Sequence, residues 1–369
     1  MIAALPTPLQ FHSTDRPAAL HRVESLNEFL STHLHRPTVL TDTGYAALSD
    51  LDRHSYNRSR LLYLSGGILI GTPSLLEAKL LLGQCFAENI GRNSGHAGLM
   101  LDGDSTLGKT TIAKALMQWV YAQYQRQFPD FRNFGQVPVV YIEVPAGSTG
   151  KLLMKTFAEF FGLTVRSGES MVSIRNRVVD TMNAAGTQLV VVDELHFLAN
   201  RNAGNGESVD LLKNLHNDLP STFLYAGVGI NGSGLLSGPR GQQLGGRFSV
   251  LEMQRFNLSK PGDPKAWRSI ISQFEKALPL RHHEIGTLPA MAEYLFERTN
   301  GSIGSLGKLL TGAAAETVNN PNFVREEITK ALLETRRLAH SAEDTRNHAR
   351  LRNNNPMTVK NILKGLTAS

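Results

Sequence analysis

The segment from residue 103 to residue 110 has the spacing of a phosphate-binding loop. It matches the pattern G-x-x-x-x-G-K-[ST] and reads, in order, Gly103, Asp104, Ser105, Thr106, Leu107, Gly108, Lys109 and Thr110, with Thr111 next. The glycines allow backbone angles at which successive N–H groups converge on a phosphate. An apolar run precedes the loop and helix-forming residues follow it, so the phosphate would lie at a helix N-terminus. We expect Lys109 to reach the β- and γ-phosphates of ATP and the Thr110 hydroxyl to ligate Mg²⁺.

A pair of carboxylates follows a second apolar run, "LVVVDELHFL", at residues 189–198. A strand that ends in Asp193 and Glu194 delivers both side chains to the carboxyl edge of a sheet, where ligands bind in open α/β folds. We expect Asp193 to hold Mg²⁺, directly or through water, and Glu194 to polarise the water that attacks the γ-phosphate. For His196, which follows the pair, a contact with the site, a solvent-exposed position and a packing role are all open.

Attack on a γ-phosphate also needs positive charge on the far side, often from an arginine. The segment "SGPRGQQLGGRFSVLEMQRF" places Arg240 and Arg247 ahead of the last apolar strand, and Arg247 directly precedes that strand. We interpret Arg247 as the stronger candidate for an arginine that acts on a neighbouring subunit's nucleotide, and Arg240 as the weaker one.

Apolar runs alternate with helical patterns around these residues. The five strand candidates are "GLMLDG", "VPVVYIEV", "QLVVVDEL", "TFLYAGVG" and "SVLEMQRF". Near-continuous Val, Ile and Leu runs indicate strands covered on both faces, and the alternation predicts an α/β fold with a five-stranded parallel sheet between helices. The expected organisation is an N-terminal helical segment (1–90), a nucleotide-binding domain (91–258), a C-terminal helical lid (259–335) and a basic tail (336–369).

Charge and composition limit the class of protein. The net charge is +6, and residues 325–369 carry nine basic against five acidic residues. This bias is compatible with a polyanionic partner, but a solvated surface explains it more simply. The single cysteine, Cys85, excludes an internal disulfide and a Cys-based zinc cluster. We expect a cytoplasmic protein without a membrane partner, because no apolar run reaches the ~18–20 residues of a membrane span and the N-terminus lacks the basic start of a signal peptide.

The whole pattern resembles an AAA+ P-loop NTPase, and within that class the TniB/TnsC transposition ATPases, relatives of MuB. Four segments resemble that family beyond the phosphate loop and the Asp-Glu pair: "RSRLLYLSGGILIGTPSLLEAKLLL", "IEVPAGSTGKLLMKTFAEFFGL", "GRFSVLEMQRF" and "TNGSIGSLGKLLTGAAAETV". Together they span about residues 55–320.

The resemblance implies a DNA-binding regulator of transposition. Proteins of this kind assemble in the ATP state as a ring or helical filament on duplex DNA, recruit a transposase and disassemble after hydrolysis. It implies that Lys109 and Thr110 hold ATP–Mg²⁺ and that Arg247 reaches a neighbour's γ-phosphate. Double-stranded DNA would contact Thr149, Lys151 and Arg166 through its phosphates, and a target-selection adaptor would be a further protein partner.

Three departures from the family pattern predict slow ATP turnover. Val228 stands where a polar sensor residue is usual, with Asn231 as the nearest substitute. The lid segment "GSIGSLGK" lacks the sensor arginine common in AAA+ proteins, and the Gly-rich loop after the Asp-Glu strand is long. Slow ATP hydrolysis is better suited to limiting how long an assembly persists than to driving repeated mechanical work.

Two other functions fit the same residues. One is an AAA+ helicase loader or initiator, although no winged-helix ending is recognisable. The other is a scaffold or signalling P-loop NTPase, which would not bind duplex DNA in the presence of ATP.

Overall fold

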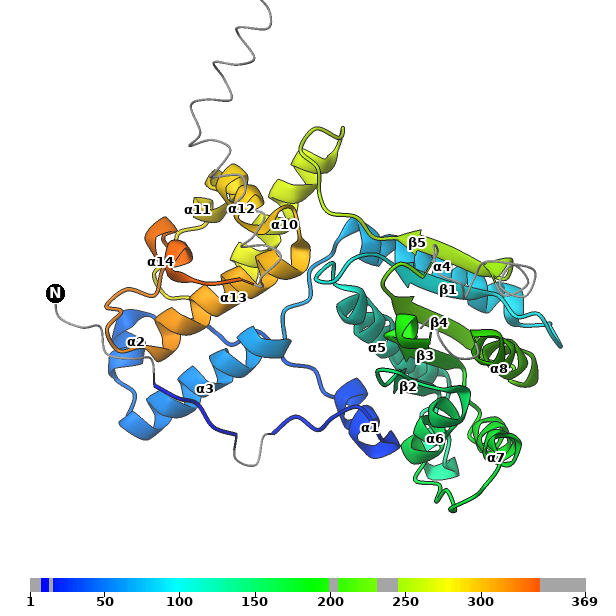
Figure 1. Cartoon of the computed structure of the whole chain (residues 1–369). Coiled ribbons are helices and arrows are strands. Elements are labelled where there is room, and N and C mark those ends of the chain that lie inside the picture. The colour runs from blue at the N-terminus through cyan, green and yellow to red at the C-terminus, as the bar shows by residue number, and fades with distance from the viewer. Residues whose placement is uncertain (1–7, 13–15, 199–204, 231–244, 339–369) are drawn as a thin grey trace, which may run out of the picture. The chain divides into compact units, whose positions relative to one another are not determined.

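The fold is described from a computed structural model of the chain, which describes residues 8–12, 16–198, 205–230 and 245–338 (Figure 1). The chain divides into two compact units. One joins 11–33 to 71–254 and contains the sheet. Among the described residues, the other unit joins Leu34–Ile70 to 255–338, and it also takes in 8–10.

A five-stranded sheet forms the centre of the first of these units. Its strands are β1 (Gly98–Asp102), β2 (Val139–Glu143), β3 (Leu189–Asp193), β4 (Thr222–Gly227) and β5 (Phe248–Glu252). They lie in the order β2-β3-β4-β1-β5, and every pair is parallel. All residues of β1, β3 and β4 are buried, as expected for strands covered on both faces. The predicted fold class is confirmed.

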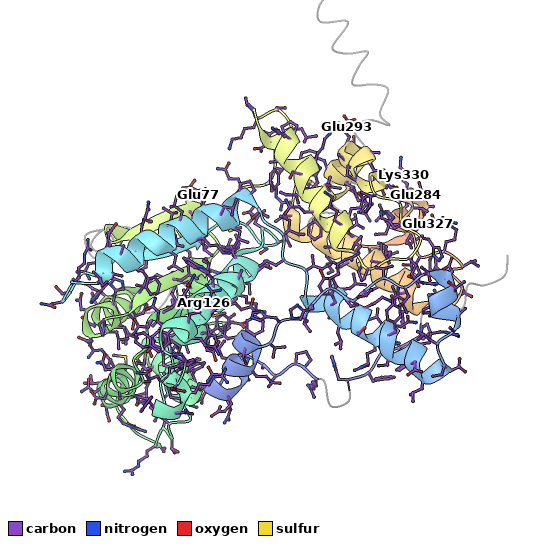
Figure 2. All side chains as sticks on the ribbon, turned by 180° about the vertical axis from the view of Figure 1, so that it is seen from behind. Glu77, Arg126, Glu284, Glu293, Glu327 and Lys330 are labelled. Atoms are coloured by element: carbon purple, nitrogen blue, oxygen red, sulfur yellow. The ribbon has the colours of Figure 1, made fainter. Side chains whose placement is uncertain are left out.

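Two helices of the sheet unit, α1 (Val23–Ser31) and α4 (Pro73–Asn89), precede β1. Four more lie between strands in the expected alternation: α5 (Lys109–Gln127), α6 (Gly150–Phe160), α7 (Met171–Ala184) and α8 (Asn205–Asp218). Short 3₁₀ turns are η1 (Phe131–Phe134) and η2 (Leu195–Leu198). Thr72 caps α4 by accepting a hydrogen bond from Leu75 N, and Pro73 fits the first turn. Arg126 lies in the last turn of α5, where a cation favours the helix dipole (Figure 2).

The second unit is helical. It contains α2 (Asp42–Ala46), α3 (Asp50–Gly66), α10 (Asp263–Ala277), α11 (Thr287–Ala290), α12 (Ala292–Thr299), α13 (Ile303–Asn319) and α14 (Lys330–Thr335). α3 packs along α13, and Trp267 is buried in the core beside Phe256 and Phe296. Arg60 on α3 is fully buried and paired with Glu326, while Arg281 binds the same carboxylate.

The N-terminal 90 residues do not form one structural segment, in contrast to the expected division. Leu26 and Leu30 of α1, and the buried side chains of α4, belong to the core of the sheet unit. Leu64 and Ile70 belong to the core of the helical unit. The apolar faces of these helices therefore complete two different cores.

No helix in the described ranges could cross a lipid bilayer, because each is too short or too polar.

Candidate nucleotide site

The loop that the sequence predicts to bind phosphate, called the phosphate loop below, lies between the carboxyl end of β1 and the first turn of α5. Gly108 has φ of 89° and directly precedes α5. Gly103 has φ of 153°, and a Cβ there would lie 2.5 Å from the carbonyl oxygen of Met253, so no larger residue fits. Thr106 also has a positive φ, of 67°. The loop therefore curls tightly over the start of the helix, where backbone N–H groups and the helix dipole favour an anion.

Lys109 is folded over this loop. Its ammonium group donates hydrogen bonds to the carbonyl oxygens of Gly103, at 2.6 Å, and Asp104, at 2.7 Å. Burial lowers the pKa of Lys109, and the nearby carboxylates, first Glu194 and then Asp193, act in the opposite direction. The ammonium group of Lys109 is thus a buried cation next to the position where the loop would hold a phosphate.

Asp193 is the most buried carboxylate of the site, with 2% of its surface exposed. Its Oδ2 accepts a hydrogen bond from the Thr110 hydroxyl at 2.8 Å and one from the Tyr141 hydroxyl at 3.3 Å, while Oδ1 accepts from Glu194 N at 2.9 Å. Burial, followed by the charge of Asp193, raises the pKa of Tyr141, so the phenol stays a donor. The structure therefore brings together the two residues that the sequence assigned to Mg²⁺.

The donor set fits a magnesium ion held jointly with a nucleotide. Thr110 offers a hydroxyl oxygen and Asp193 a carboxylate oxygen, which are the hard ligands that Mg²⁺ takes up, and Mg²⁺ keeps its other positions for water and phosphate. Within the described ranges there is no group of three or more His, Cys, Asp or Glu residues that could hold a metal ion.

Glu194 leaves the end of β3 with a φ of 56°, which is unusual for a residue with a side chain. Its side chain is 35% exposed, and Oε2 lies 3.2 Å from His196 Nδ1. His196 therefore contacts the site, and its ring also packs against Phe197.

Arg247 lies at the amino-terminal ends of the strands, whereas the phosphate loop lies at their carboxyl-terminal ends. It immediately precedes Phe248, which is in register with Gly98 at the start of β1. Five parallel-strand residues span about 16 Å, so Arg247 cannot reach the nucleotide of its own chain. Its guanidinium donates to Asn217 Oδ1 at 2.6 Å. Arg240 and Asn231 lie outside the described residues.

The three residues expected to contact DNA are exposed. Thr149 caps α6 by accepting a hydrogen bond from Leu152 N at 3.3 Å, and Lys151 follows in the first turn. Arg166 lies in the connection between α6 and α7, where its backbone N–H donates to Glu169.

Sequence reasoning missed two residues of this site. Tyr141 is buried within β2 and reaches Asp193 only because β2 and β3 are neighbours. Asp102, which ends β1, accepts a hydrogen bond from Ile230 N at 2.9 Å and so holds the segment after β4 beside the phosphate loop. The sequence could have indicated Asp102 as a site residue, because it ends an apolar strand in the same way as Asp193.

Comparisons with known proteins bear on the family and on the fold. Residues 86–258 match the family model described as bacterial TniB protein. The Aeropyrum pernix ORC2 protein, solved as ADPNP–ADP complexes, has a TM-score of 0.54 and 16% identity, with 75% of this chain and 70% of that chain covered. The Aeropyrum pernix ORC1 protein, solved in complex with DNA, has a TM-score of 0.53 and 20% identity, with 75% and 68% covered. At these identities the two structures show the shared fold alone. A comparison with curated proteins gives no match.

Proposed function

We propose that the chain is an ATP-dependent DNA-binding regulator of transposition, from the premise that residues 86–258 match the model of the bacterial TniB family and that the chain shares the fold of the ORC structures. In this proposal it assembles on target duplex DNA in the ATP state, recruits or activates a transposase, and disassembles when ATP is hydrolysed. The observation that carries the proposal is the contact of Thr110 with Asp193 at 2.8 Å beside the buried amine of Lys109.

Each residue of the site has a separate task in hydrolysis. Lys109 exchanges its two loop carbonyls for phosphate oxygens, and the N–H groups of the loop bind the remaining oxygens. Thr110 and Asp193 would hold Mg²⁺, which when bound neutralises charge on the β- and γ-phosphates. Glu194 accepts the proton of the attacking water. Slow turnover is expected because Val228 provides no polar side chain at the end of β4.

Assembly would complete the site. Arg247 lies at the amino-terminal ends of the strands, and the phosphate loop lies at their carboxyl-terminal ends. A γ-phosphate that Arg247 contacts must therefore belong to another copy of the chain. Such a contact is possible only between neighbours in a ring or filament, so nucleotide binding and assembly would depend on each other.

DNA contact is assigned to the exposed Thr149, Lys151 and Arg166. Contacts of this kind are made to phosphates, so they position the protein without reading sequence and weaken as salt rises. A transposase and a target-selection adaptor are the protein partners that a DNA-marking assembly would require.

The proposal is tested by a mobility-shift titration on duplex DNA without nucleotide, with ADP and with a non-hydrolysable ATP analogue, each at several salt concentrations. We expect DNA binding with the analogue alone, and a steep loss of affinity for DNA as salt rises.

Glu194→Gln should remain assembled on DNA in ATP, whereas the wild type should dissociate. A monomer that ignores DNA at low salt with saturating Mg²⁺–ATP would favour the scaffold NTPase instead.

A further inference from the structure

Asn217, in the last turn of α8, binds the guanidinium group of Arg247. Arg247 Nη1 donates to Asn217 Oδ1 at 2.6 Å, and both side chains are partly buried. Because a guanidinium group has donors only, the amide oxygen of Asn217 must face it. Arg247 also passes close to Gly95, where a built Cβ would lie 3.9 Å from Arg247 Nε. The arginine is therefore held between the end of α8 and the connection that leads into β1.

The end of α8 is itself fixed to the sheet by His216. This residue is fully buried, and its ring packs against Phe223 of β4, with 4.9 Å between ring centroids, and Phe248 of β5, with 5.1 Å. Its carbonyl oxygen lies 3.2 Å from Nδ1 of the buried His96. Asn217 is therefore carried on a well-packed element, as a residue that orients another side chain must be.

The acceptor that Arg247 contacts is a neutral amide, although a carboxylate is next to it in the chain. That carboxylate, Asp218, pairs with Arg175 of α7, and within the described ranges Arg247 has no ion pair. Burial, followed by the charges of Arg247 and His96, lowers the pKa of His216 to about 3, so this neighbouring ring stays neutral. The guanidinium charge is thus not neutralised within its own subunit by any described side chain.

We infer that Asn217 is a positioning residue that holds Arg247 ready for the nucleotide of a neighbouring subunit. The hydrogen bond fixes the direction of the guanidinium group before assembly, so less conformational freedom is lost when the group meets a γ-phosphate. Because the acceptor is neutral, the charge of the arginine stays available to the phosphate, and no ion pair has to be broken. This inference rests on the proposed function, in which Arg247 acts between subunits.

Steady-state ATPase measurements on Asn217 variants test the positioning role. We expect Asn217→Ala to lower kcat roughly tenfold, with KM for ATP within about twofold of the wild type. Asn217→Asp should lower kcat further, because a carboxylate forms an ion pair with Arg247 and competes with the phosphate. Asn214→Ala and Asn214→Asp are the matched controls, since Asn214 is exposed on the same helix, and both should behave as the wild type.

Mixing experiments tell whether the defect lies in the arginine that a chain donates. Asn217→Ala mixed with Lys109→Ala should regain activity, because the intact phosphate loop of the first chain then meets the well-held arginine of the second. Asn217→Ala mixed with Arg247→Ala should not regain activity, because every arginine present at that position is poorly held. A defect in the nucleotide site of the Asn217→Ala chain itself would give the opposite pattern.

Three results would overturn the inference. They are a kcat for Asn217→Ala that is lowered by less than about twofold, a higher kcat for Asn217→Asp than for Asn217→Ala, and recovery with Arg247→Ala but not with Lys109→Ala. The proposed function survives each of them if Arg247→Ala is itself impaired. Normal turnover by Arg247→Ala would instead refute action between subunits, and the role of Asn217 with it.

Spectra of ¹⁵N-labelled arginine test the contact without turnover. The Arg247 signal is identified by its loss in Arg247→Lys. Rotation of its guanidinium group should be slow in the wild type, faster in Asn217→Ala and slower still in Asn217→Asp, because the hydrogen bond at Nη1 restrains it and an ion pair restrains it more. Equal rotation rates in the wild type and Asn217→Ala would refute the contact, even if the wild type proved unable to hydrolyse ATP.

Discussion

In the proposed function, Lys109 is the residue on which nucleotide binding depends most directly. Lys109→Ala removes the buried cation that faces the loop, and each hydrogen bond to a charged group contributes about 1.5–3 kcal/mol. We therefore expect ATP affinity to fall at least about tenfold, and nucleotide-dependent DNA binding to disappear. Fluorescent-nucleotide titration and mobility shift measure the two effects. Lys114→Ala, on the same helix, is the control, and normal DNA binding by Lys109→Ala would break the proposed link.

Tyr141 gives a finer test of the Asp193 environment. Tyr141→Phe keeps the ring in β2 and removes the hydroxyl that donates to Asp193 Oδ2. Loss of such an outer contact typically weakens metal binding 10- to 100-fold, and the 3.3 Å distance places our expectation at about tenfold or less. The Mg²⁺ concentration for half-maximal ATPase activity should rise accordingly.

Tyr225→Phe is the matched control for this change. Tyr225 is a buried tyrosine of β4, and within the described ranges its hydroxyl has no hydrogen-bond partner. Its removal should leave the Mg²⁺ requirement unaltered. Equal shifts in both variants would indicate a general effect on the sheet instead of a contact with Asp193.

At the scale of elements, the position of Arg247 at the start of β5 predicts action between subunits. Arg247→Ala should lower ATP turnover while nucleotide affinity stays near that of the wild type. Mixing it with Lys109→Ala should restore part of the activity, because an intact phosphate loop from one chain then meets an intact arginine from the other. Activity that stays absent at every mixing ratio would leave the proposed action between subunits without support.

The sequence predicted those elements whose signal is local. The strand–loop–helix unit around Lys109 and the Asp-Glu strand end are each read from one continuous segment. The contacts of Tyr141 with Asp193 and of Asp102 with Ile230 depend on which strands become neighbours, and periodicity does not carry that information. The same reason explains the division of residues 1–90, because an amphipathic helix does not specify which core will cover it.

At the scale of the whole molecule, one buried ion pair should control the acid stability of the helical unit. Burial alone would raise the pKa of Glu326, but hydrogen bonds and charge from Arg60, and then from Arg281, outweigh it and lower the pKa. Because the folded pKa lies below the unfolded one, the pair stabilises the fold above the unfolded pKa of about 4.3. That contribution is lost as pH falls through the folded pKa.

Glu326→Gln should therefore lower the free energy of unfolding by about 3–5 kcal/mol at neutral pH, since it leaves Arg60 buried and unpaired. It should also reduce the loss of stability on acidification. Glu327→Gln is the control (Figure 2), because its pair with Arg325 is exposed and worth at most about 1 kcal/mol. Urea titrations of both variants at several pH values measure the difference, and equal stabilities would contradict the assigned role of the pair.

The interleaving of the two units along the chain has a consequence for biosynthesis. α3 acquires its packing partner α13 only roughly 240 residues later. At about 5–20 residues per second, a ribosome needs on the order of 12–50 s to make that stretch. Throughout this time the apolar side of α3 on the nascent polypeptide lacks the α13 surface that covers it in the folded protein, so we expect nascent chains to bind chaperones until α13 has been made.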